Sequence, residues 1–440
     1  MRIAASGFVS DAGGSVASAN AALLRGLLDA GHEVDFFSKS SFVDPRPSVG
    51  NRGGFRFIEA DNAVTDALRA TLERVPLLGF AACRVDCARY IRIIFQQIIK
   101  EKTTRRYDVV FWMGTYAPKR VPGVPMVSFA QGPPGTDARS VISRFNEVCQ
   151  LAGRLNALKW RTLAQLRLSP LGLPNFRNSD RIIVGSEQSR STLHNLFGLP
   201  RTITSALPYP IDLDLFHPEV QSTQKRDVFR VLWLGRIIPR KRLDLFLKGV
   251  ETTIRNGENV TATIVGNVGF IPGYERMIDR FPYPDRITWI RSVPRAEVPD
   301  LIRQHDVLAQ PSEEEDFGSS VAEAQACGVP TIVGRTNGNF AYLSDRDIHL
   351  TADTSECLAD ALTTLLQRRS TRDGQTQRHI SRSFAERCFS LESILPKLEQ
   401  ILLRASQTNP SAGTLQSDAT ESEDHATTSA EQVTVSSSFR

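Results

Sequence analysis

The chain has 440 residues, of which 41% are hydrophobic and 23% charged, and its formal net charge is +5 at pH 7. This length and composition predict an ordinary soluble protein with two or three domains and a large core. No stretch approaches the roughly 18–20 consecutive apolar residues of a membrane span, and no aromatic-rich basic motif indicates a nucleic-acid partner.

The charge is unevenly distributed along the chain. Residues 1–220 contain 27 Lys and Arg against 19 Asp and Glu, whereas the remainder contains 26 against 29. A basic N-terminal half suits an anionic partner such as a phospholipid surface or a lipid-phosphate acceptor. Ordinary scatter of surface charge explains the same difference equally well.

The cysteines and the first residues indicate the compartment. The six cysteines form no C-x-x-C pair and no zinc-type spacing with histidine, which predicts buried or free thiols in a reducing environment. The opening MRIAASGFVSDAGG has one basic residue and no long apolar region, so it is typical of a first strand rather than a signal peptide. We therefore expect a cytoplasmic protein, at most peripheral on the inner face of the membrane.

The N-terminal residues predict the first strand–helix–strand unit of a doubly wound sheet. We expect a strand over residues 2–8, a helix over 16–30 and a second strand over 32–37. Gly13 and Gly14 would then lie at the carboxyl edge of the sheet, where such folds bind ligands. A tight turn explains two adjacent glycines equally well.

The rest of the first half continues this alternation. The apolar runs predict strands at residues 55–59, 108–113, 125–130 and 181–186, and helices at 63–75, 84–101 and 140–168. The last of these helices combines a leucine stripe with several Arg and Lys. This pattern fits both a basic amphipathic surface that contacts a membrane and a helix packed on the sheet with solvated arginines. Gln131 begins an irregular loop at a strand end, over residues 131–137.

A basic turn follows the first strand of the second half. The strand at residues 229–234 ends at Gly235, and a helix is predicted over 242–250. Arg236 and Lys241 therefore lie between a strand end and a helix start, where a diphosphate binds in doubly wound sheets. A solvated basic turn is the alternative.

A strand, a turn and a helix start are also predicted between residues 307 and 330. The strand over 307–310 is followed by an acidic run, and Phe317-Gly318 allows the backbone to turn tightly. Ser319 and Ser320 are good N-cap residues for the helix that follows. We expect this segment to form part of a ligand-binding edge.

Two glutamates of this segment are candidate ligands for a phosphate or a polyhydroxylated molecule. Glu315 would lie at the edge of the sheet and Glu323 in the first turn of the helix, with free helix amides between them. Two alternatives remain open. Residues 313–316 can be a solvated acidic loop, and Ser320 with Glu323 can be a capping box.

The sequence motifs resemble a known family. The run E-D-F-G-S-S-V-A-E-A-Q-A-C-G-V-P, with Gly-Arg-x(4)-Lys upstream, resembles the signature of retaining, nucleotide-sugar-dependent glycosyltransferases of family four. The resemblance implies an α/β fold with two Rossmann-like domains, the GT-B architecture, and a donor cleft between them. It implies an acceptor domain over residues 1–205, a donor domain over 206–380 and a helix over 381–405 that crosses back. Residues 406–440 are predicted to be a disordered tail.

The resemblance also implies roles for the candidate residues. Arg236 and Lys241 would bind the diphosphate, Glu315 the sugar hydroxyls and Glu323 the ribose. Gln131 stands where many relatives carry a histidine, and glutamine can hydrogen-bond but cannot take a proton. The remaining implied binding residues are Gly13, Gly14, Gly235, Phe317, Gly318, Ser319 and Ser320. No metal and no cofactor is expected, and the co-substrate would be a UDP- or GDP-linked sugar.

These implications predict a metal-independent retaining hexosyltransferase for surface polysaccharide or glycolipid synthesis. Its partners would be a nucleotide-sugar donor and a glycan or lipid-linked hydroxyl acceptor, with peripheral membrane contact. The alternatives are a GT-B-type sugar-nucleotide epimerase or phosphorylase, and a non-catalytic nucleotide-sugar-binding protein.

Overall fold

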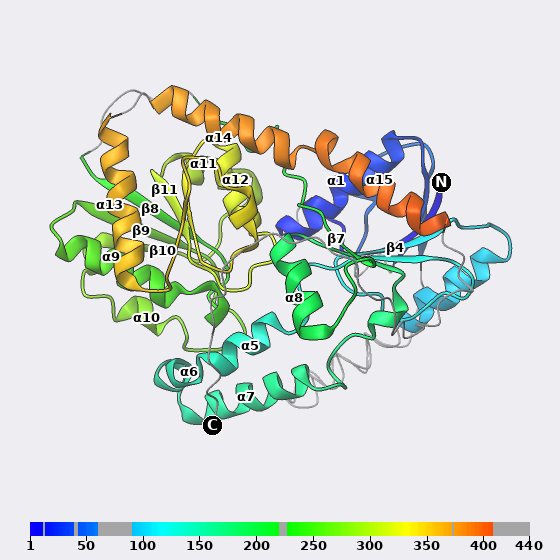
Figure 1. Cartoon of the computed structure of the whole chain (residues 1–440), viewed down its shortest axis with the longest axis horizontal. Helices are drawn as coiled ribbons and strands as arrows, with labels where there is room; N and C mark the ends of the chain where they lie inside the picture. Colours follow the sequence, from blue (N-terminus) through cyan, green and yellow to red (C-terminus); the bar gives the residue numbers. More distant parts are fainter. Residues whose placement is uncertain (12–13, 39–42, 60–89, 220–226, 372–373, 408–440) are drawn as a thin grey trace, which may run out of the picture.

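The computed structural model describes residues 1–407 except 12–13, 39–42, 60–89, 220–226 and 372–373 (Figure 1). The first of its two parallel sheets has seven strands in the order β3-β2-β1-β4-β5-β6-β7. These strands are β1 (Arg2–Gly7), β2 (Glu33–Ser38), β3 (Phe55–Glu59), β4 (Val109–Met113), β5 (Met126–Phe129), β6 (Arg181–Val184) and β7 (Thr204–Ala206).

Helices and short connections complete the first domain. One helix occupies residues 90–102. The others are α1 (Ser15–Asp29), α2 (Arg46–Val49), α5 (Thr136–Ser143), α6 (Phe145–Ala152), α7 (Arg154–Leu168) and α8 (Glu187–Phe197), with a 3-10 turn, η1, at Phe176–Asn178. The predicted helix over residues 63–75 lies outside the described residues, as does the part of the next one over 84–89.

The second sheet has six parallel strands in the order β10-β9-β8-β11-β12-β13. They are β8 (Phe229–Leu234), β9 (Val260–Val265), β10 (Ile287–Ile290), β11 (Val307–Gln310), β12 (Thr331–Val333) and β13 (Ile348–His349). The helices are α9 (Leu243–Arg255), α10 (Arg276–Asp279), α11 (Val298–Arg303), α12 (Ser319–Ala326), α13 (Ser355–Thr371), α14 (Gly374–Phe389) and α15 (Leu391–Gln407). Two parallel, helix-covered sheets confirm the predicted α/β fold with two Rossmann-like domains.

Two long predicted helices are interrupted in the structure. The helix predicted over 140–168 is wrong, because three helices, α5, α6 and α7, occupy this stretch. Gly153, with φ of 85°, ends α6 and begins α7, and glycine adopts this backbone region without steric cost. The apolar stripe continues across the break, so periodicity alone did not show it. The predicted helix over 381–405 is likewise divided, since the Ser390 hydroxyl accepts a hydrogen bond from the Ser393 amide at the start of α15.

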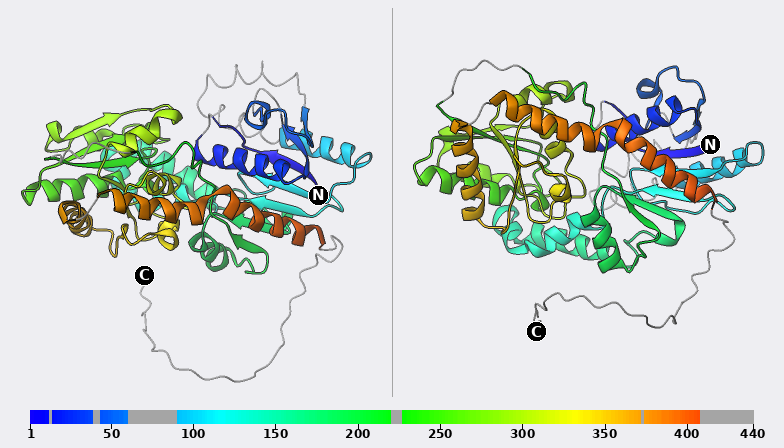
Figure 2. Two further views of the ribbon diagram at one scale, coloured as in Figure 1. Left: turned by 90° about the horizontal axis from the view of Figure 1, so that it is seen from above. Right: turned by 45° about the horizontal axis from the view of Figure 1, so that its top comes forward.

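The two domains share the C-terminal helices. Figures 1 and 2 show α14 lying against the second domain and α15 running across the first. At Gly26 of α1, an added Cβ would meet the side chains of Leu395 and Leu391 at 3.1–3.3 Å, so α15 packs closely on α1. The amide of Ile211 donates to the carbonyl of Phe389, 2.9 Å away. The chain therefore returns from the second domain to the first.

An aromatic cluster joins the domains at the centre of the molecule. The ring of Phe317, which is 1% exposed, lies 5.0 Å from Tyr209 and 5.3 Å from Phe389 between ring centroids. Tyr209 in turn lies 5.4 Å from Phe129 at the end of β5. Offset and edge-on aromatic contacts of this kind add to the free energy gained by burial. This cluster fixes the loop that precedes α12 against the first domain.

None of the described helices is long and apolar enough to cross a membrane.

Candidate functional site

The candidate site lies where the loops after β8 and β11 meet. These two strands are neighbours, and β9 and β12 extend the sheet from them in opposite directions. In parallel sheets such a reversal of strand order leaves a crevice at the carboxyl ends of the strands. The topology therefore brings together the basic turn 235–242 and the acidic loop 311–318, which are far apart in sequence.

The centre of the site is a carboxylate held by two cations. The Lys241 ammonium lies 2.5 Å from Oε2 of Glu315, and the Arg240 guanidinium lies 2.9 Å from the same oxygen. All three side chains are 10–13% exposed. Burial by itself would raise the pKa of Glu315, but the charges of Arg240 and Lys241 outweigh it and hold that pKa at about 2. Glu315 is therefore ionised at neutral pH.

The two predicted cations, Lys241 and Arg236, differ in how deeply they are buried. Lys241 is buried next to Glu315, and Gly235 lies directly beside the Lys241 side chain. Arg236 is 61% exposed and lies 3.7 Å from a carboxylate oxygen of Asp137. Arg240, which was not predicted, is 10% exposed and donates from Nε to Asp137, 2.7 Å away. The sequence signal that could have identified Arg240 is its position directly before Lys241, the lysine of the motif.

The acidic residues 313–316 are engaged in ion pairs and hydrogen bonds. The alternative prediction of a solvated acidic loop is therefore wrong. Glu313 lies 2.7 Å from Arg242 and also pairs with Arg144. Glu314 accepts from Nε of Arg139 at 2.9 Å. Because Arg139 and Arg144 belong to α5 and the residue after it, these ion pairs connect the two domains. Their partners are more than 150 residues apart, so sequence spacing carried no signal for them.

Asp316 is the fourth member of this acidic run and also contacts the first domain. Its two carboxylate oxygens each lie 3.0 Å from the amide nitrogen of Gly185, and it accepts from the Tyr209 hydroxyl. Burial raises the pKa of Asp316 to about 6, more than these hydrogen bonds lower it. A carboxyl group that titrates near neutral pH therefore lies in the domain interface.

This pKa predicts a dependence of stability on pH. The folded chain takes up a proton on Asp316 as the pH falls through about 6, whereas an unfolded aspartate does so only near 3.8. We therefore expect the contribution of Asp316 to the free energy of unfolding to increase, by about 2 kcal/mol, between pH 7 and pH 4. The measurement is urea unfolding of wild type and Asp316→Asn across this range. A constant difference between the two proteins would contradict the expectation.

The helix that follows begins one residue earlier than its predicted caps. Gly318, with φ of 68°, is the N-cap of α12, and Ser319 is already helical. The prediction of a serine N-cap is thus wrong, because the left-handed backbone needed here favours glycine. The hydroxyl of Ser320 accepts a hydrogen bond from the side-chain amide of Gln310, 2.7 Å away. The ring of Phe317 belongs to the interdomain aromatic cluster.

Glu323 is buried and paired with a cation. Its side chain is 3% exposed, and its Oε1 lies 2.7 Å from the guanidinium of Arg295. Burial raises the pKa of Glu323, and the charge of Arg295 opposes this. Arg295 also lies over the ring of Phe216, 4.8 Å from its centroid. Because its carboxylate pairs with Arg295 and the N-cap is Gly318, the capping-box alternative is wrong. No sequence signal pointed to Arg295, which precedes Glu323 by 28 positions.

The first domain contributes a polar cavity of about 500 Å³ beside these loops. Gln131, at the carboxyl end of β5, lines it, and so do Asp137, Tyr116 and Arg167. Among the described residues, the buried Nε2 of Gln131 has no hydrogen-bond partner. The shared residue Asp137 connects this cavity to Arg240. Gly14 is the N-cap of α1 and has open space around it, while Gly13 lies outside the described residues.

An apolar cavity of about 290 Å³ adjoins the polar one. Asp137, Ala138 and Arg167 line both. The remaining lining residues of the apolar cavity are Val141, Trp160, Leu163, Ala164, Leu166 and Phe270. Together the two cavities offer a polar space near the ion pairs and an apolar space beyond it. Among the described residues, no group of three or more His, Cys, Asp or Glu could hold a metal ion.

Two families match this chain. The family described as Glycosyl transferases group 1 matches residues 219–382, and the one described as Glycosyltransferase Family 4 matches residues 13–215.

Relatives and solved structures agree with these matches. D-inositol 3-phosphate glycosyltransferase 2 of Catenulispora acidiphila is 29% identical over 182 residues, which are 38% of this chain and 43% of the relative. The GDP-mannose-dependent alpha-(1-6)-phosphatidylinositol monomannoside mannosyltransferase of Mycolicibacterium smegmatis is 26% identical over 42% of this chain and 52% of its own length. The chain thus spans about half of these relatives.

Similar structures extend over most of the chain. A Rickettsia africae glycosyltransferase superimposes with a TM-score of 0.63 at 12% identity, covering 92% of this chain and 98% of that one. Anabaena HepE in complex with UDP and glucose superimposes with a TM-score of 0.59 at 16% identity, covering 92% and 99%. At these identities the likeness shows a shared fold.

Proposed function

Because the chain belongs to the family-four glycosyltransferases, which have the GT-B fold, we propose that it is a retaining enzyme that moves a sugar from a nucleotide diphosphate to a hydroxyl acceptor. The observation that carries this proposal is the buried cluster of Arg240, Lys241 and Glu315 at the carboxyl ends of β8 and β11. It combines fixed positive charge with a carboxylate at the place where parallel sheets bind nucleotides.

The cations suit a leaving diphosphate. As the bond between the anomeric carbon and the phosphate oxygen breaks, the sugar becomes oxocarbenium-like and negative charge develops on the diphosphate. Lys241 and the exposed Arg236 would stabilise that charge, and Arg240 would hold Glu315 and Asp137 in place. These side chains would supply the positive charge without a metal ion. Full activity in the presence of a chelator is the expected result.

Glu315 is suited to bind the sugar of the donor. Both cations contact its Oε2, so Oε1 is left to accept hydrogen bonds from sugar hydroxyls. Backbone groups near Gly318 and Ser319 lie in the same loop, at the start of α12. Glu323 would bind the ribose hydroxyls and Arg295 would orient its carboxylate. Donors linked to UDP or GDP fit this arrangement equally, and one relative is named for GDP-mannose whereas Anabaena HepE was solved with UDP.

The acceptor proton needs a base other than Gln131. An amide can position the acceptor hydroxyl but cannot take its proton at neutral pH. We propose that the acceptor oxygen attacks the anomeric carbon from the face that the diphosphate leaves. The new glycosidic bond then forms on that face, and the proton passes to an oxygen of the departing phosphate. The configuration at the anomeric carbon is retained, which NMR of the product would establish.

The adjoining cavities suit an amphiphilic acceptor. A hydrophilic headgroup fits the polar cavity beside Asp137 and Arg167, and an apolar chain fits the cavity lined by Trp160 and Leu166. Two leucines of this region are strongly exposed: Leu171, which lines the polar cavity, to 84%, and Leu155, at the start of α7, to 86%. A glycolipid, as in the name of the phosphatidylinositol monomannoside mannosyltransferase of Mycolicibacterium smegmatis, is therefore the proposed acceptor class, with peripheral contact of α7 to the cytoplasmic face of a membrane.

Membrane contact by this surface can be measured directly. Removing two leucines that insert into the interface forfeits about 1.5–3 kcal/mol each, so we expect Leu155→Glu combined with Leu171→Glu to weaken binding to anionic liposomes at least tenfold. The matched control is Leu196→Glu, which replaces a 59% exposed leucine on α8. Equal liposome binding by both variants would exclude α7 as the contact surface.

A panel of nucleotide sugars tests the transferase proposal. We expect one class of UDP- or GDP-linked sugar to raise the melting temperature of the wild type. This stabilisation should be lost in Glu323→Gln, which keeps the shape of the side chain and removes its charge. Turnover without an acceptor would instead identify an epimerase, dependence on phosphate a phosphorylase, and tight binding without any turnover a non-catalytic protein.

A further inference from the structure

Asp137 lies at the boundary between the polar cavity and the cations proposed to bind the diphosphate. It belongs to the first turn of α5, its side chain is 37% exposed, and it lines both cavities. Its Oδ1 accepts a hydrogen bond from Nε of Arg240, 2.7 Å away. Arg240 in turn contacts Oε2 of Glu315, 2.9 Å away. Asp137 therefore connects the space proposed for the acceptor with the donor site.

The two oxygens of this carboxylate are held differently. Oδ1 is anchored by Arg240, whose side chain is only 10% exposed. Oδ2 lies 3.7 Å from the guanidinium of Arg236, a distance too long for a good hydrogen bond. Over the part of the chain that the structure describes, Oδ2 accepts no hydrogen bond. One oxygen of Asp137 is thus fixed, and the other can change its partner.

The backbone that carries Asp137 is fixed against the second domain. Although α5 precedes β6 of the first domain in sequence, its residues Ala138 and Val141 belong to the hydrophobic cluster formed by the strands of the second domain. The ion pair of Arg139 with Glu314, 2.9 Å long, holds α5 there as well. The carboxylate is therefore preorganised beside the basic turn.

The guanidinium of Arg236 is held only weakly. Its side chain is 61% exposed, and among the described residues the carboxylate with which it pairs is Asp137. An ion pair this exposed shifts an equilibrium by about fivefold at most. A diphosphate carries more negative charge than one carboxylate and can accept two parallel hydrogen bonds from a guanidinium. A bound diphosphate should therefore draw Arg236 away from Asp137.

We propose that Asp137 exchanges Arg236 for the acceptor hydroxyl during each turnover. In the empty site Oδ2 faces Arg236, and the arriving diphosphate takes over that guanidinium. The released Oδ2 then accepts a hydrogen bond from the acceptor hydroxyl in the polar cavity and orients its oxygen towards the anomeric carbon. The proton still passes to the departing phosphate oxygen. This role rests on the proposed transferase function and adds to it an order, in which the donor binds before the acceptor.

Nucleotide binding provides a test with a characteristic sign. Asp137→Asn keeps the shape of the side chain and removes the charge that competes with the diphosphate for Arg236. We expect UDP or GDP, whichever the wild type binds, to bind about three- to fivefold more tightly to this variant in calorimetric titrations. The loss of a purely structural contact would weaken binding instead. In an Arg236→Gln background the gain should fall below about twofold, because the two side chains act as a pair.

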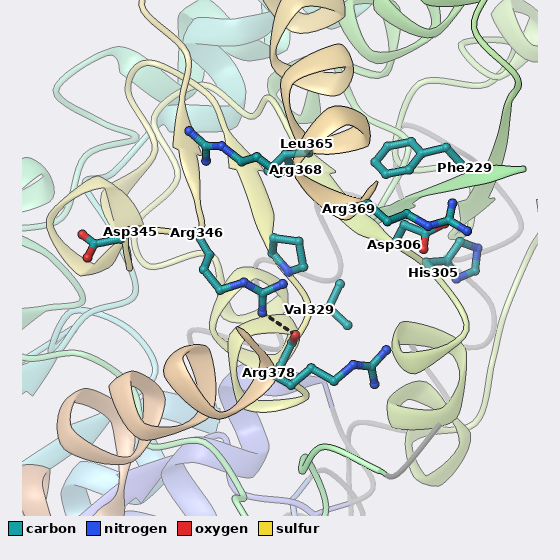
Figure 3. A pocket seen from close by; sticks show the side chains of 12 residues that line it. Phe229, His305, Asp306, Val329, Asp345, Arg346, Leu365, Arg368, Arg369 and Arg378 are labelled. Carbon is teal, nitrogen blue, oxygen red and sulfur yellow. Dashed lines mark hydrogen bonds and ion pairs between the residues drawn. The ribbon is translucent and has the colours of Figure 1, made fainter. Parts of the chain in front are cut away.

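Two matched controls separate this exchange from a general effect of charge. Glu314→Gln removes a carboxylate that is likewise 37% exposed and paired with an arginine, Arg139 of α5. Asp306→Asn removes the carboxylate paired with Arg369 directly before β11, at the opposite edge of the sheet, beside the small cavity of Figure 3. Both variants should bind the nucleotide within about twofold of the wild type. Equal tightening in either control would overturn the exchange.

Turnover reports on the acceptor side. Hydrolysis of the donor, in which the oxygen of water bonds to the anomeric carbon as the bond to the phosphate breaks, should be about tenfold slower or more in Asp137→Asn, because the attacking oxygen loses its orientation. Weaker nucleotide binding or unchanged hydrolysis in this variant would overturn the role of Asp137 and leave the transferase proposal intact. A wild type that binds no nucleotide would instead refute the transferase function itself.

Discussion

Lys241→Met is expected to lower kcat by about 100-fold or more. The ammonium lies at the carboxyl end of β8, beside Gly235, where the leaving diphosphate would accumulate charge. Loss of one fixed charge or donor aimed at a developing anion typically costs this much in rate. Methionine keeps the length and much of the volume of the side chain. Steady-state kinetics with the donor identified by the nucleotide-sugar panel is the measurement.

Stability separates this effect from misfolding. Glu315 keeps its contact with Arg240, 2.9 Å away, when Lys241 is replaced, so the melting temperature should change little. The matched control is Lys248→Met, which removes an exposed lysine from α9. Turnover within a few-fold of wild type in Lys241→Met would contradict the proposed role. Glu315→Ala is a poorer test, because it would leave two buried cations without their carboxylate and cost about 3–5 kcal/mol in stability.

Phe317→Ala is expected to lower the free energy of unfolding by about 3–5 kcal/mol. The ring is 1% exposed and contacts Tyr209, Phe389 and Tyr342, with centroids 5.0–6.0 Å away. Its removal would leave a cavity at the junction of both domains and the crossing helix. The loop that carries Glu315 is anchored by this ring, so we expect transferase activity to fall as well.

Chemical denaturation measures this loss, and a second phenylalanine serves as control. Phe340 is 51% exposed, and Phe340→Ala should change stability by less than about 0.5 kcal/mol. A loss of similar size in both variants would show that the aromatic cluster does not hold the domains together. A loss in Phe317→Ala with unaltered kinetics at low temperature would separate the ring's structural role from the positioning of Glu315.

The sequence was most informative about local secondary structure. Strand alternation, glycine turns and helix periodicity depend on residues within a few positions, and they predicted most strands of both sheets and the fold class, but not the short strands β7 and β13. The same locality explains the errors. The break at Gly153 interrupts a stripe that stays apolar on both sides, and the Gly318 cap depends on a left-handed backbone that a serine does not favour.

The sequence by itself determined which residues reach the carboxyl edge of the second sheet, because strand ends and helix starts fix Gly235, Lys241 and Glu315 there. Only the tertiary structure decided which charges meet. Asp137 and Arg240 are 103 positions apart, and Arg139 and Glu314 are 175 apart. Such pairs form when two separately folded sheets close on each other, and no local propensity encodes that closure.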